Sequence, residues 1–97
     1  MAKLICLSSV SQWEIKQVSK YPEIKLFIEK LKRMIEYHPE NGLPDSFLSS
    51  KGKTVPCLKQ SINLLLFPPQ YSLGYTFITA FYVYNNTEIL IIDLHFS

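Results

Sequence analysis

The stretch that decides the fold is YTFITAFYVYNNTEILIIDLHF, residues 75–96. β-Branched and aromatic residues dominate its two runs, and Asn85-Asn86 between them tolerates the positive φ of a tight hairpin turn. Both faces of each run are largely apolar, which is typical of strands that are covered on both sides, or covered on one side and joined to a partner on the other. We therefore expect this hairpin at the centre of a sheet. Alternation predicts two faces for each run. In the first run, one face holds Phe77, Thr79, Phe81 and Val83 and the other holds Thr76, Ile78, Ala80, Tyr82 and Tyr84. In the second run, one face holds Leu90, Ile92, Leu94 and Phe96 and the other holds Ile89, Ile91, Asp93 and His95.

The N-terminal part of the chain predicts a short strand followed by two helices. Residues 3–7 form an apolar run, and the capping-box sequence Ser11-Gln12-Trp13-Glu14 predicts a helix over residues 10–19. Proline suits the first turn of a helix, so we expect a second helix from Pro22 to Tyr37. Apolar residues recur there at helical spacing and are expected to face the core: Ile24, Phe27, Ile28, Leu31 and Ile35.

The middle of the chain predicts a loop and then a strand. Residues 40–53 contain many turn formers, including Asn41-Gly42 and Pro44-Asp45, and we expect no regular structure there. A strand is expected over residues 54–67. The whole order predicts an α+β protein: a small antiparallel sheet, made of the short N-terminal strand and three C-terminal strands, with both helices packed on one face.

Length and composition indicate one globular domain over residues 1–97. Apolar residues make up 47% of the chain and charged residues 19%, a balance that excludes a disordered protein. No apolar run reaches the length of a membrane span and no signal peptide is evident, so we expect a cytoplasmic protein without a membrane partner. Cys6 and Cys57 lack metal-ligand spacing, and we expect neither a metal nor another cofactor.

The order of elements resembles the RelE/ParE superfamily of small bacterial toxins. The resemblance rests on FIEKLKRMI with the following HPENGLPDSFLSSKGK, and on the hairpin YTFITAFYVYNNTEILIIDL, and it covers nearly the whole chain. It implies the toxin component of a type II toxin–antitoxin system, neutralised by a cognate antitoxin. RelE-like members cleave mRNA on the ribosome and inhibit translation, whereas ParE-like members inhibit gyrase.

Two other interpretations stay open. The strand segments SINLLLF and YTFITAFYV hold none of the lysines and arginines that ribonuclease members carry on their middle strands. The alternative is therefore a non-catalytic protein-interaction module on the same fold, either a ParE-like target inhibitor or a decayed toxin. A stand-alone homodimer is the third interpretation, because the high apolar content favours a surface covered by a second copy.

RNA cleavage at a 2′-OH requires a base, a cation for the developing phosphorane charge and an acid for the leaving oxygen. Candidate catalytic residues are His95, Lys53 and Lys59, because imidazole titrates near neutrality and the lysines are the nearest cations to the expected concave face. Asp93, two residues before His95, is placed to orient it or to pair with a lysine.

Candidate RNA-binding residues are Lys51, Lys53, Tyr71 and Tyr75, since ammonium groups bind phosphates and aromatic rings stack on bases. Each candidate also has a structural interpretation. Lys51 and Lys53 are then solvated loop charges, Lys59 protects a strand edge, and the tyrosines belong to the core or an interface. His95 then bonds to backbone or water. The other histidine, His38, is expected to complement the dipole at a helix C-terminus.

Overall fold

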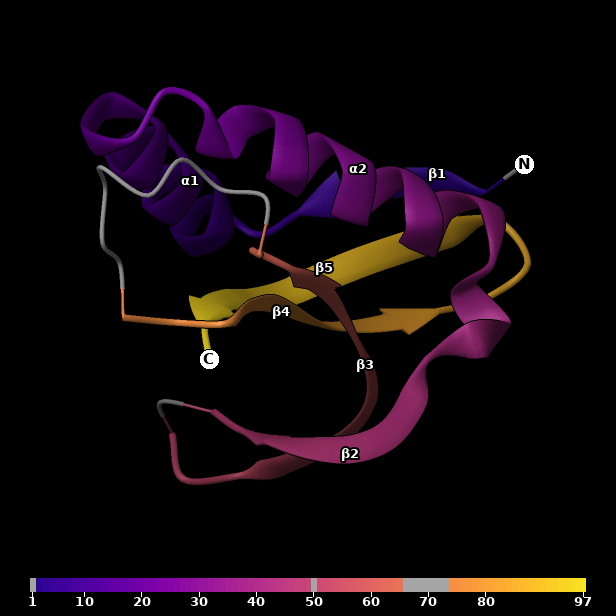
Figure 1. Ribbon diagram of the computed structural model, residues 1–97. Coiled ribbons are helices and arrows are strands. Elements are labelled where there is room, and N and C mark those ends of the chain that lie inside the picture. Colours follow the sequence, from indigo (N-terminus) through magenta and orange to yellow (C-terminus); the bar gives the residue numbers. More distant parts are fainter. Residues whose placement is uncertain (1, 50, 66–73) are drawn as a thin grey trace.

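The computed structural model describes residues 2–49, 51–65 and 74–97. Five strands form one sheet in the order β1-β5-β4-β3-β2, and both helices lie on one side of it (Figure 1). The expected α+β class is thus confirmed. The elements are β1 (Lys3–Cys6), α1 (Ser8–Lys20), α2 (Ile24–Tyr37), the 3₁₀ turn η1 (Pro39–Asn41), β2 (Leu43–Leu48), β3 (Thr54–Asn63), β4 (Phe77–Tyr84) and β5 (Glu88–Phe96).

The sheet is mixed and not antiparallel throughout as expected, because β1 lies parallel to β5 whereas the other neighbours are antiparallel. The two helices carry the chain from β1 to β2, at opposite edges of the sheet. β4 is the central strand and β5 is its neighbour, so the C-terminal hairpin occupies the middle of the sheet as expected.

The helices pack their expected apolar residues against this hairpin. Ile24, Ile28, Leu31 and Ile35 of α2 are fully buried. They form the core with Ile78, Ala80 and Tyr82 of β4 and with residues of β5, and burial of this apolar area is the main stabilising term of the fold.

The capping-box prediction for the first helix is wrong. α1 begins at Ser8, and the carbonyl oxygen of Leu7 accepts hydrogen bonds from the Val10 and Ser11 amides at 3.0 and 3.1 Å. Leu7 is itself tied to β5, since its amide donates to the carbonyl oxygen of Ile91 at 3.2 Å. The chain therefore leaves the sheet directly into the helix, and Ser11 lies inside it. The second helix begins at Ile24, two residues later than expected.

The segment expected to be a loop contains an additional strand. β2 pairs antiparallel with β3 from Leu43↔Lys59 to Leu48↔Thr54, although it contains Pro44. Proline is tolerated because β2 is an edge strand. Tertiary contacts stabilise it: the Phe47 ring lies 5.9 Å from that of Phe81 on β4. Figure 1 shows β2 at the edge of the sheet opposite β1, with β3 between it and β4.

β3 itself ends at Asn63, earlier than the expected residue 67, and residues 66 and 67 lie outside the described ranges.

A β-bulge in the central hairpin corrects the predicted faces of β5. Phe81 pairs with Asp93 but Tyr82 pairs with Ile91, so one extra residue, Ile92, is accommodated on β5. The bulge resets the alternation. Leu94 consequently joins Ile89 and Ile91 in the core, whereas Asp93 and His95 move to the opposite face. Burying an unpaired carboxylate against the helices would be costly, and the bulge avoids it.

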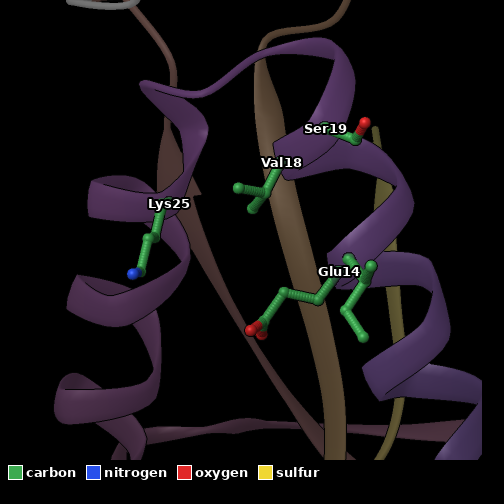
Figure 2. Close-up of a pocket in the computed structure, with 5 residues that line it drawn as sticks. Glu14, Val18, Ser19 and Lys25 are labelled. Carbon is green, nitrogen blue, oxygen red and sulfur yellow. The ribbon is translucent and has the colours of Figure 1, made fainter.

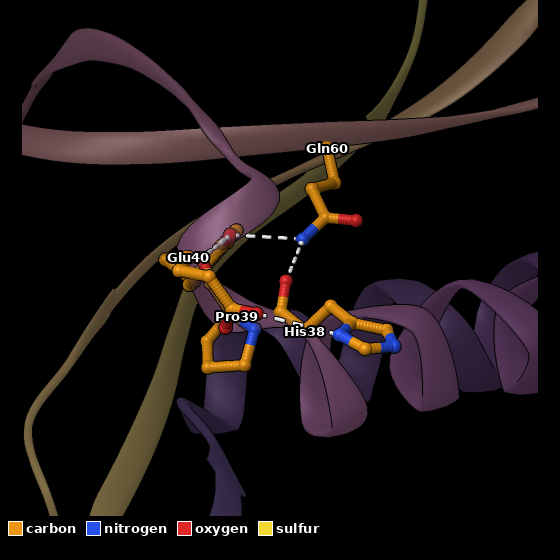
Figure 3. A network of polar contacts seen from close by, with 5 residues as sticks. His38, Pro39, Glu40 and Gln60 are labelled. Atoms are coloured by element: carbon orange, nitrogen blue, oxygen red, sulfur yellow. Dashed lines mark hydrogen bonds and ion pairs between the residues drawn. The ribbon is translucent and has the colours of Figure 1, made fainter.

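A buried tyrosine fixes the turn that follows α2. The Tyr82 hydroxyl donates to the carbonyl oxygen of Pro39 at 2.5 Å and accepts from Gln60 Nε2 at 3.0 Å. Gln60 Nε2 also donates to the carbonyl oxygen of His38 at 2.9 Å (Figure 3). These bonds attach η1 to β3 and β4 and so set where β2 begins. Gly42 follows η1 with no room for a side chain, because an added Cβ would lie 2.8 Å from Leu58 Cβ.

Candidate functional site

The face of the sheet opposite the helices, which we call the open face, collects the polar side chains of four strands. The register aligns Lys59, Phe81 and Asp93 in one row across β3, β4 and β5, and aligns Ser61, Thr79 and His95 in the next row. β2 adds Asp45 and Phe47. These eight residues define the open face, and they come from segments up to 50 residues apart in the sequence.

His95 is held on two sides. Its Nδ1 lies 2.7 Å from Asp93 Oδ2, and its ring stacks on Phe81 with a centroid distance of 5.4 Å and an interplanar angle of 26°. Because the carboxylate accepts from Nδ1, the neutral imidazole presents Nε2 as a proton acceptor. The His95 side chain is 39% exposed, so Nε2 belongs to a ring that solvent reaches. This arrangement suits a general base, with Asp93 as the orienting group that sequence analysis considered.

Lys59 forms an ion pair with Asp45 of β2, at an Nζ–Oδ2 distance of 2.8 Å. Hydrogen bonds from Lys59 and then from the Ser46 amide hold the pKa of Asp45 below its ordinary value, so this carboxyl stays ionised. Lys59 does not protect a strand edge, because β2 pairs with β3 up to this residue. The structural interpretation of Lys59 as a charge that protects an exposed strand edge is therefore wrong.

A chain of three hydroxyls lies beside His95. Thr79 Oγ1 is 2.8 Å from Ser61 Oγ and 2.8 Å from Ser97 Oγ. Thr79 is buried, whereas Ser61 and Ser97 are exposed. The thiols are poor candidates for a nucleophile on this protein, because burial raises the pKa of Cys6 and of Cys57 and keeps both protonated.

The structure does not bring all of the predicted site residues together. Lys51 and Lys53 are exposed in the turn that precedes Thr54, whereas Ser61, in the row of His95, lies near the other end of β3. Tyr75 stacks on Phe96 with a centroid distance of 5.2 Å and keeps about half of its surface exposed. Tyr71 lies outside the described residues.

His38 sits at the C-terminus of α2, as expected, with Nδ1 3.3 Å from Glu40 Oε1.

Four of the residues that surround His95 and Lys59 were not among the candidates expected from the sequence. Alternation placed Thr79 and Phe81 on a common face but gave no sign that this face would be the open one. Ser61 lay in a segment with little alternation, and Asp45 lay in the expected loop. Only the pairing of β2 with β3 brings Asp45 to Lys59.

A second surface feature lies between the helices. Glu14 of α1 pairs with Lys32 of α2 at 2.5 Å. A pocket of about 370 Å³ opens beside Glu14 (Figure 2). Its lining includes Ile15 and Val18 of α1 and Lys25 of α2. Ile15 of this lining is 70% exposed, so the pocket presents apolar surface to solvent.

Comparison with protein-family models, with curated proteins and with solved structures found no significant match. Within the described residues, no helix has the length and apolar character needed to cross a bilayer. The same residues contain no group of three or more His, Cys, Asp or Glu side chains that could hold a metal ion. The function of the open face is therefore inferred from the chemistry of its own residues.

Proposed function

We propose that this chain is the toxin component of a type II toxin–antitoxin system, a RelE-like endoribonuclease that inhibits translation by cleaving mRNA. The observation that supports the proposal best is the Asp93–His95 pair on the open face, with Asp93 in the row of Lys59 and His95 in the next row. A base, a cation and hydroxyl donors are the groups that metal-independent cleavage at a 2′-OH requires.

Three open-face residues take defined roles in this proposal. His95 Nε2 accepts the proton of the attacking 2′-OH, and the resulting imidazolium is stabilised by the Asp93 carboxylate. The 2′-oxygen attacks phosphorus, and the 5′-oxygen leaves with a proton from an acid or water. Lys59 stabilises the negative charge of the phosphorane. One strand, β4, lies between the strand of Lys59 and β5. The distance is therefore two interstrand spacings, roughly 10 Å, which a lysine side chain and an RNA backbone can span together.

The proposed partner is a cognate antitoxin, and the groove between α1 and α2 is the surface that we assign to it. Ile15, which is largely exposed, and Val18 provide apolar contacts in its lining. The same observation favours the second candidate function, a non-catalytic interaction module in which this groove is the only functional surface. The two functions differ in what they require of His95: cleavage depends on its imidazole, whereas binding at the helices does not.

Induced expression in a bacterial host tests the proposal. We expect growth arrest with shortened mRNA, and relief of both by His95→Gln, because general acid–base groups contribute about 10²–10⁴-fold to rate. His38→Gln is the matched control, since His38 is exposed and lies outside the open face. Growth arrest and mRNA length are likewise compared between Lys59→Gln and the control Lys16→Gln on α1. Lys53→Ala tests whether the turn lysine expected to act in catalysis and RNA binding is needed for arrest.

The outcomes separate the alternatives. Arrest with intact mRNA and induced DNA damage would support a ParE-like inhibitor. Absence of arrest at any expression level would support the non-catalytic module. Arrest with mRNA cleavage that His95→Gln leaves unchanged would reject the catalytic roles proposed for the open face.

A further inference from the structure

A small polar pocket borders the open face where β3 extends beyond β2. The pairing of β2 with β3 stops at Leu43↔Lys59, so the following residues of β3 pair only with β4. A pocket of about 250 Å³ lies at this step, lined by Asn41, Leu43, Lys59, Gln60 and Ser61. Asn41 belongs to η1, the turn that Tyr82 attaches to the sheet.

Three side chains of the lining can donate to an anion. They are the Lys59 ammonium, the Asn41 carboxamide and the Ser61 hydroxyl. Gln60 has no donor left for an anion, since its Nε2 donates to the His38 carbonyl and to the Tyr82 hydroxyl. These bonds hold its side chain in place in the lining.

The Ser61 hydroxyl can keep its proton free to donate outside the chain of hydroxyls. The chain Ser61–Thr79–Ser97 has three hydroxyl protons and two hydrogen bonds, so one proton is not used within the chain. When Ser97 donates to Thr79 and Thr79 donates to Ser61, the Ser61 proton is free to point into the pocket. Hydrogen bonds in such a chain polarise one another and strengthen the terminal donor.

We propose that this pocket binds a phosphate group, and that Asp45 competes with the phosphate for Lys59. The ligand class rests on three convergent donors, one of them cationic, around a space of this size. In terms of the proposed function, the pocket holds the phosphate next to the reacting one, and Lys59 contributes its charge to both. Ser61 is two interstrand spacings, roughly 10 Å, from His95, so the two phosphates are distinct. Asp45, 2.8 Å from the Lys59 ammonium, keeps the cation occupied when no phosphate is bound.

Titration of the full chain with inorganic phosphate, followed by ¹H–¹⁵N chemical shifts, tests the proposal without any need for RNA cleavage. Shifts are expected at Asn41, Lys59 and Ser61. Ser61→Ala and Lys59→Gln should weaken binding severalfold, whereas Lys16→Gln, which removes an equal charge on α1, should not. Asp45→Asn should tighten binding by about twofold to fivefold, since an exposed ion pair competes only modestly.

The opposite sign for Asp45→Asn, or shifts spread over the helix lysines, would overturn the proposal. A short deoxyribonucleotide oligomer, which has no 2′-OH to react, identifies the source of the phosphate. It should shift the same residues and also His95. If it does not compete with inorganic phosphate, the pocket serves a free anion and its link to RNA is rejected. If the pocket binds phosphate as described but induced expression leaves mRNA intact, the proposed ribonuclease function is rejected and the proposed phosphate site is retained.

Discussion

Removing the hydroxyl of Tyr82 tests whether one buried group fixes the turn between the helical layer and β2. Tyr82 is fully buried, and its hydroxyl joins the Pro39 carbonyl to Gln60. Tyr82→Phe keeps the ring and leaves the Pro39 carbonyl without this donor. The loss of a buried partner costs about 1–3 kcal/mol. In a domain of this length, about 1 kcal/mol lowers the melting temperature by roughly 4–8 °C.

Chemical and thermal unfolding followed by circular dichroism measure this effect. Tyr84→Phe is the matched control, because Tyr84 is 43% exposed and no hydrogen bond of its hydroxyl is found in the part of the chain that the structure describes. We expect the control to stay within about 0.5 kcal/mol of the parent protein. Equal unfolding free energies for the two variants would refute the inference that the Tyr82 network holds η1 in place.

Two further predictions concern the same region. Gly42→Ala should destabilise the protein by about 1–3 kcal/mol in urea unfolding, because the new methyl group would overlap the Tyr82 hydroxyl and lie 2.8 Å from Leu58 Cβ; an unchanged midpoint would show that the turn has space. Alkaline pH should also destabilise the fold. Burial raises the pKa of Tyr82 despite the opposing hydrogen bond from Gln60, so the unfolded chain loses this proton first, near pH 10. The stabilisation is complete below that pH and is lost as pH rises through the folded pKa. Tyr82→Phe should therefore show a smaller loss of unfolding free energy above about pH 10 than the parent protein, and equal slopes would contradict the assignment.

The amino-acid sequence by itself determined the layers of this protein. The apolar spacing of α2 identified its buried face, because helical periodicity reports burial directly. The density of β-branched and aromatic residues identified β4 and β5 as the sheet centre. The sequence also identified His95, Asp93 and Lys59 as candidates. It grouped them with Lys53, which lies in the turn before β3, at the end of that strand away from Ser61 and the row of His95.

Only the tertiary structure decided how the open face is assembled. β2 has poor local strand propensity, and its pairing with β3 and the contact of Phe47 with Phe81 compensate for that; no local pattern reveals such long-range contacts. The bulge at Ile92 likewise leaves no trace in the alternation of β5, yet it moves Asp93 and His95 from the helix side to the open face. A single inserted residue reverses every side chain beyond it, and the cost of burying a carboxylate against the helices favours the reversed arrangement.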